Sequence, residues 1–103
     1  MFRQGDVLLV PVGKIDLNET VLNEKMRKGN KVVLAEGEVT GHAHTMTTET
    51  TTPLLFGGRE IIVVAEPTPL RHQEHGEIEV SPGTYWVVRQ REYTPQAIRR
   101  VTD

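Results

Sequence analysis

Two short segments of the chain carry the residue types best suited to chemistry, His42-Ala43-His44 and His72-Gln73-Glu74-His75. In a strand, residues two apart point to the same side, so His42 and His44 are expected to project together. A three-residue spacing does not do this, but a turn can bring His72 and His75 together. Imidazole binds zinc, iron, copper and nickel, and it titrates near neutral pH. The two segments therefore predict a metal site or an acid–base site, provided that they meet in space.

A first prediction is a site for a divalent metal ion. It requires that the second segment fold back over the first, so that three or four imidazoles meet. A bound ion would polarise a phosphoryl or carbonyl oxygen or lower the pKa of bound water, so the predicted reaction is hydrolysis of a phosphate-containing substrate. The predicted metal ligands are His42, His44, Glu49, His72 and His75. Glu74 is the alternative source of a carboxylate, as a ligand or as a group that orients one.

The same histidines support a second prediction that needs no metal ion. Two imidazoles can act as general base and general acid, as cleavage of RNA or of a cyclic-nucleotide phosphodiester requires. An arginine would then hold the phosphate. The residues predicted to be catalytic are His42, His44, His72, His75, Arg71 and Arg89. Aromatic residues are only 5% of the chain and basic residues are few, which favours a small anionic substrate over extended nucleic acid.

The composition predicts one small domain spanning residues 1–103, with 37% hydrophobic and 25% charged residues. No apolar run approaches the roughly 20 residues of a membrane helix, so no membrane partner is expected. The chain has no cysteine, which excludes disulfides, thiolate metal sites and cysteine nucleophiles and makes a cytoplasmic location the expectation. The net charge of −2 favours no class of partner. All four histidines lie in the glutamate-rich stretch of residues 32–83.

Short apolar runs separated by glycine and proline predict an all-β barrel or sandwich with a short C-terminal helical turn at residues 96–101. The expected strands are residues 7–12, 31–36, 42–49, 54–65 with a hairpin turn at Gly57-Gly58, 78–80 and 84–92. Residues 50–53 are expected to be a break, and residues 14–30 a short helix or an ordered loop. Met46, Trp86 and Val88 are expected in the core. Unpaired edge strands also favour a third prediction, a non-enzymatic interaction module or a homodimer.

The histidine segments resemble the metal motifs of the cupin family. The first cupin motif has two histidines separated by one residue, followed by a glutamate and then a glycine. His42, His44, Glu49 and Gly57 match it. The second, PxGxxH, is matched in spacing by Pro67, Pro69 and His72, with proline in place of glycine. The resemblance implies a cupin-like fold and a metal ion bound by His42, His44, Glu49 and His72. It leaves His75 for acid–base work or for orientation.

Most of the chain also resembles a family of small bacterial and phage proteins to which no function is attached. The segments that carry this resemblance are RQGDVLLVPV, LAEGEVTGHAH, HQEHG, SPGTYWVVRQREYTP and IRRV. The resemblance implies no activity. It does imply that the histidine segments and the last strand belong to one structure.

Overall fold

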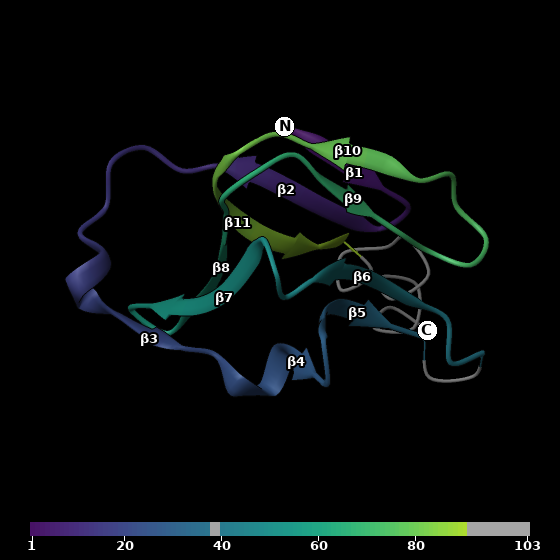
Figure 1. The fold of residues 1–103 in the computed structure, drawn as a ribbon, viewed down its shortest axis with the longest axis horizontal. Helices are drawn as coiled ribbons and strands as arrows, with labels where there is room; N and C mark the ends of the chain where they lie inside the picture. The colour runs from purple at the N-terminus through teal and green to yellow at the C-terminus, as the bar shows by residue number, and fades with distance from the viewer. Residues whose placement is uncertain (38–39, 91–103) are drawn as a thin grey trace, which may run out of the picture.

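Antiparallel strands make up most of the computed structural model, which describes residues 1–37 and 40–90 (Figure 1). They are β1 (Phe2–Gln4), β2 (Val7–Pro11), β3 (Thr20–Leu22), β4 (Arg27–Lys28), β5 (Lys31–Glu36), β6 (Ala43–Thr47), β7 (Thr51–Phe56), β8 (Arg59–Val64), β9 (Thr68–Leu70), β10 (Ile78–Val80) and β11 (Gly83–Arg89). Two short 3-10 turns, η1 (Leu17–Glu19) and η2 (Glu24–Met26), flank β3. Within the described range, no helix is long and apolar enough to cross a membrane. The all-β prediction is confirmed.

Three sheets form the scaffold within the described part of the chain. The largest has six strands in the order β1-β2-β11-β8-β7-β3, and smaller sheets have the orders β4-β5-β6 and β10-β9. The two smaller sheets are joined by a bridge between Thr45 and Arg71, whose backbone N–H groups and carbonyl oxygens exchange hydrogen bonds of 2.9 and 3.0 Å. The chain after β9 therefore runs beside β6, and this pairing brings the two histidine segments together.

One hydrophobic core is shared by the large sheet and the smaller ones. The large sheet contributes Val7, Leu9, Ile62, Val64, Tyr85 and Val87. The smaller sheets contribute Val32, Leu34, Ala35, Met46, Leu70 and Val80, and η2 adds Met26. Burial of one large apolar side chain stabilises a fold by roughly 1.5–3 kcal/mol. The described strands do not close into a barrel, and the layers packed on this shared core give a sandwich-like arrangement.

The expected break at residues 50–53 is wrong, because Thr51–Phe56 forms the continuous strand β7. Pro53 lies opposite Ile62 of β8, inside the large sheet. Proline has no N–H to give to a ladder, which is why a break was expected. Its carbonyl oxygen nevertheless accepts a 2.9 Å hydrogen bond from the backbone N–H of Asn23, so the proline still contributes to sheet pairing.

The face of β11 that packs in the core is the opposite of the one expected. Tyr85 and Val87 are buried, because they lie opposite core residues of the neighbouring strands β8 and β2. Trp86 is only half-buried on the other face, as is Val88. There the guanidinium carbon of Arg59 lies 4.0 Å from the centroid of the indole ring. This cation–π contact stabilises a large aromatic ring that has no place in the core.

Other elements follow the sequence more closely. The hairpin between β7 and β8 turns at Gly57 and Gly58, and Met46 is a core residue. Residues 14–30 form the two 3-10 turns and the short strands β3 and β4 in place of one short helix or an ordered loop. The end of the strand expected at 84–92 and the helical turn expected at 96–101 lie outside the described residues.

Candidate functional site

The four histidines lie together in one pocket. The ring centroids of His44 and His72 are 4.3 Å apart, and those of His72 and His75 are 4.6 Å apart. The His42 ring lies 5.8 Å from that of His72. The cavity between the rings has a volume of about 380 Å³, and its other lining residues are Gly5, Asp6, Gly37, Thr40 and Glu74. The two histidine segments therefore meet in space, which is the condition that a shared site depends on.

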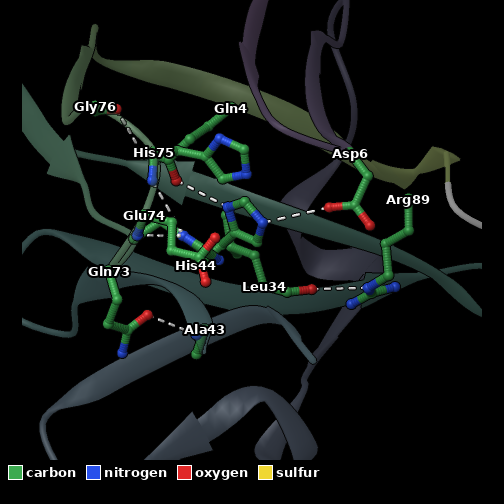
Figure 2. A network of polar contacts seen from close by, with 11 residues as sticks. Gln4, Asp6, Leu34, Ala43, His44, Gln73, Glu74, His75, Gly76 and Arg89 are labelled. Carbon is green, nitrogen blue, oxygen red and sulfur yellow. Dashed lines mark hydrogen bonds and ion pairs between the residues drawn. The ribbon is translucent and has the colours of Figure 1, made fainter. Parts of the chain in front are cut away.

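His44 is the most buried member of the group, with 4% of its surface exposed. It lies two residues before Met46 on β6 and points to the same, inner side of the strand. Figure 2 shows the ring held between two side chains of the β1–β2 hairpin. Its Nδ1 atom lies 2.8 Å from Oε1 of Gln4, and its Nε2 atom lies 3.3 Å from Oδ1 of Asp6.

Gln4 determines which nitrogen of His44 carries hydrogen. The Nε2 group of Gln4 donates hydrogen bonds to the carbonyl oxygens of Leu70, at 2.8 Å, and Gly76, at 2.9 Å. Because carbonyl oxygens only accept, the amide orientation is fixed and Oε1 must be the atom that faces His44. Oε1 also only accepts, so Nδ1 of His44 carries a hydrogen. The other nitrogen, Nε2, is therefore unprotonated whenever the imidazole is neutral.

The environment keeps His44 neutral at physiological pH. Burial lowers its pKa from 6.5 to about 4, and the neighbouring His72 acts in the same direction, while Asp6 opposes the shift. The neutral ring points the lone pair of Nε2 at a carboxylate oxygen, so two acceptors face each other. Such an arrangement is unfavourable unless a proton or a metal cation lies between the two atoms.

The other rings differ in what they offer to the pocket. Nδ1 of His42 lies 2.6 Å from Oε1 of Glu74, so this nitrogen donates and Nε2 is left with a lone pair when the ring is neutral. Nδ1 of His72 instead accepts from the backbone N–H groups of Glu74, at 3.0 Å, and His75, at 3.3 Å. The Nε2 atom of His72 therefore carries the hydrogen. Desolvation, followed by the charges of His75 and His42, lowers the pKa of His72.

Gly5 provides the space that the His75 ring occupies. A Cβ atom on Gly5 would lie 2.6 Å from Nε2 of His75, and the residue has a φ of +59° at the first loop position of the β1–β2 hairpin. A positive φ at this position is typical of glycine in two-residue hairpin turns. The turn can therefore lie against the imidazole only because the residue has no side chain.

Sequence reasoning did not find Gln4, Gly5 or Asp6. In the sequence, Gly5-Asp6 marks only the start of an apolar strand, and nothing local indicates that the turn faces histidines about 40 and 70 residues away. The one available signal is the placement of a polar Gln-Gly-Asp triplet directly before a strand whose first three residues are buried.

Three residues predicted for the site lie elsewhere. Glu49 is exposed in the turn after β6. Arg71 is exposed, and its Nε donates to Oε1 of Glu77 at 2.9 Å. Arg89 is bound by both carboxylate oxygens of Glu60, and its Nε donates to the carbonyl oxygen of Leu34 at 2.7 Å (Figure 2). None of the three lines the histidine pocket.

The charged side chains that line the pocket, apart from the histidines, are all acidic. Among the described residues, its lining contains two carboxylates, Asp6 and Glu74, and neither lysine nor arginine. In residues 1–37 and 40–90, no three histidine or acidic side chains are already arranged as ligands around one point. His44 and Asp6 are the pair whose acceptor atoms approach each other directly. The pocket therefore holds one close imidazole–carboxylate pair, with the other imidazoles beside it.

Fold and site together define a small all-β protein with a pocket lined by histidines and carboxylates. The chain belongs to the family described as Domain of unknown function (DUF8820), whose model matches residues 3–90. The match includes every residue of the histidine pocket. No curated protein and no solved structure matches the chain. Membership of a family without an assigned function is as expected, while the cupin relationship and the bacterial or phage origin stay predictions.

Proposed function

We propose that this protein binds a divalent transition-metal ion in the histidine pocket, with His44 and Asp6 as the first two ligands. The contact between Nε2 of His44 and Oδ1 of Asp6 carries the proposal, because it sets a lone pair against a carboxylate oxygen at 3.3 Å. Two ligands of a tetrahedral ion with bonds of about 2.0–2.1 Å are roughly 3.3 Å apart. The hydrogen bond from Nδ1 to Gln4 is the kind of contact that orients a metal-binding imidazole.

The rest of the pocket supports a cation as its occupant. Two carboxylates and no basic side chain line it, so its electrostatic field attracts positive charge. His42 offers the lone pair of Nε2, and the ring nitrogens of His75 make no hydrogen bond within the described residues. A third ligand would come from one of these two rings. Imidazole with carboxylate suits zinc, iron, nickel and manganese.

The arrangement changes the predicted ligand set. Asp6 replaces Glu49 as the carboxylate ligand, and Glu74 orients His42. His72 is a hydrogen-bond donor in this conformation, since its Nδ1 accepts from the loop backbone. A bound ion would supply Lewis acidity for hydrolysis of a phosphate-containing substrate, which is the reaction we propose for the pocket.

Metal titration tests the proposal directly. Protein stripped with EDTA is titrated with Zn²⁺ by calorimetry and with Co²⁺ by visible absorption. We expect one ion per chain, a loss of affinity of at least 100-fold in His44→Ala, and a loss of at least tenfold in Asp6→Asn. Asp16→Asn, an exposed change at the N-cap of η1, is the matched control and should bind like the wild type. Wild-type protein that binds neither ion below millimolar concentration, or Asp6→Asn that binds like the wild type, contradicts the proposal.

A second candidate, metal-free acid–base catalysis, has one specific observation in its favour. His42 is oriented by Glu74 as a general base is, while His72 presents its N–H on the facing ring. We would then expect cleavage of RNA or of a cyclic-nucleotide phosphodiester to persist in excess EDTA. Complete loss of that activity on chelation, restored by added Zn²⁺, argues against this candidate and for the metal-dependent one.

The remaining predictions concern partners and location. A cytoplasmic location is expected from the cysteine-free sequence, and a homodimer or protein-interaction module is expected from the open strand edges at β1 and β3. Sedimentation of the wild type and of a His42→Ala/His44→Ala variant tests the dimer. An interaction surface unrelated to the pocket should leave the two proteins in the same oligomeric state.

A further inference from the structure

A second hollow adjoins the histidine pocket. It has a volume of about 460 Å³, within the range of small-molecule sites. Its lining residues are Asn30, Lys31, Thr45, Met46, Thr47, Pro69, Arg71, His72 and Gln73. His72 lines both cavities, so the two are neighbours across one imidazole. We call this second cavity the basic hollow.

The polar groups of the basic hollow are mainly hydrogen-bond donors. Lys31 and Arg71 supply two positive charges, and no carboxylate is in the lining. The ion pair of Arg71 with Glu77 uses Nε and leaves the two terminal NH₂ groups of the guanidinium without a hydrogen bond in the described residues. Gln73 accepts the backbone N–H of Ala43 with its Oε1 at 2.9 Å, so its amide NH₂ stays available to donate.

The strand register places both cations on one face. Lys31 lies opposite Thr47 where β5 pairs with β6, and Arg71 lies opposite Thr45 at the bridge on the other side of β6. Residues directly opposite in antiparallel pairs share a face. Lys31 and Arg71 therefore flank Thr45 and Thr47 from the two sides of β6, on one face.

We propose that the basic hollow binds the phosphate group of a small substrate and holds it beside His72. Without a metal ion the acidic histidine pocket repels such a group, whereas the two cations and several neutral donors of the basic hollow attract it. Phosphate is favoured over carboxylate because three or four oxygens can use more of these donors than two can. Phosphate binding in the basic hollow is independent of the proposed metal site. The further idea that the hollow and the histidine pocket together bind one substrate rests on the proposed function.

Nuclear magnetic resonance of the metal-free protein locates the ligand. EDTA-treated ¹⁵N-labelled protein is titrated with inorganic phosphate, and separately with acetate and chloride at equal ionic strength. We expect phosphate to shift the backbone amides of Thr45, Arg71 and Gln73, with much smaller shifts in acetate and none in chloride. Lys31→Gln and Arg71→Gln should each weaken phosphate binding at least fivefold. Both side chains are exposed, so unchanged thermal midpoints are expected. Lys25→Gln, in η2, is the matched charge control.

The outcomes separate this site from the metal site. Asp6→Asn should weaken Zn²⁺ binding without weakening phosphate binding to the metal-free protein. Phosphate shifts no larger than those of chloride, or shifts confined to the metal-loaded protein, overturn the basic hollow as a phosphate site without affecting the metal proposal. Equal affinity for acetate overturns the preference for phosphate. The chemical shift changes of the wild-type protein alone show whether phosphate binds in the basic hollow and whether it is preferred to acetate, even if a variant fails to fold.

Discussion

Nε2 of His44 lies 3.3 Å from Oδ1 of Asp6, and in the neutral ring both atoms are hydrogen-bond acceptors. The neutral form follows from the burial of the ring and from a donor role of Nδ1 that Gln4 enforces. A salt bridge would need a hydrogen on Nε2, and the neutral ring has none there, which is the reason we propose a metal ion between the two atoms.

Asp6→Asn should raise the stability of the metal-free protein. Asparagine has nearly the same shape as aspartate, and its NH₂ can donate to the lone pair of His44, which replaces a repulsion with a hydrogen bond of about 1 kcal/mol. Urea unfolding in EDTA measures the change. A protein destabilised by 1 kcal/mol or more would instead indicate that His44 is protonated and paired with Asp6.

Gly5→Ala should displace the His75 ring in the pocket, in addition to straining the backbone at residue 5. The new Cβ atom would lie 2.6 Å from Nε2 of His75, in a residue with a φ of +59°. Gly57→Ala is the matched control, because Gly57 has a φ of +57° and no atom within 4 Å of an added Cβ. We expect both variants to lose about 1 kcal/mol of stability from backbone strain. Only Gly5→Ala should also lose metal affinity, by about tenfold in a Zn²⁺ titration, and equal affinities in the two variants would show that His75 is not a ligand.

Stability of the metal-free protein should fall as the pH is lowered from about 6.5 to about 4. In this window His44 becomes protonated in the unfolded chain. In the folded chain it stays neutral, because burial holds its pKa at about 4. The unfolded state therefore binds more protons, and the free energy of unfolding decreases by up to roughly 3 kcal/mol. Unfolding in urea at several pH values gives the slope. His44→Gln should flatten it, and an unchanged slope would place the titrating group elsewhere.

Glu60→Gln should weaken the fold without weakening phosphate binding. The hydrogen bonds from Arg89 lower the pKa of Glu60, so the carboxylate stabilises the folded state above its unfolded pKa of 4.5, and this contribution is lost as pH falls. Arg89 also bonds Leu34, so the pair joins β8, β11 and β5. We expect a loss of about 1–2 kcal/mol in urea unfolding at neutral pH. Altered phosphate affinity in the same variant would restore the substrate role predicted for Arg89.

Much of the strand pattern was accessible from local sequence. Short β-branched runs, prolines and paired glycines predicted β2, β5, the β7–β8 hairpin and β10, because those residues constrain the backbone whatever surrounds them. The start of β7 was missed because the carbonyl of Pro53 is satisfied by Asn23, a partner 30 residues earlier in the chain. The inward face of β11 was missed because its neighbours β2 and β8 decide which side is buried.

The candidate site, too, was predicted in part from the sequence and decided in part by the tertiary structure. The sequence determined that four imidazoles come in two pairs, because spacing along a strand or turn is a local property. Only the tertiary structure placed Gln4 and Asp6 on either side of His44 and directed Arg89 to Glu60. Hydrogen bonds between residues tens of positions apart depend on sheet register, and that register is set by packing of the shared core, which no single segment encodes.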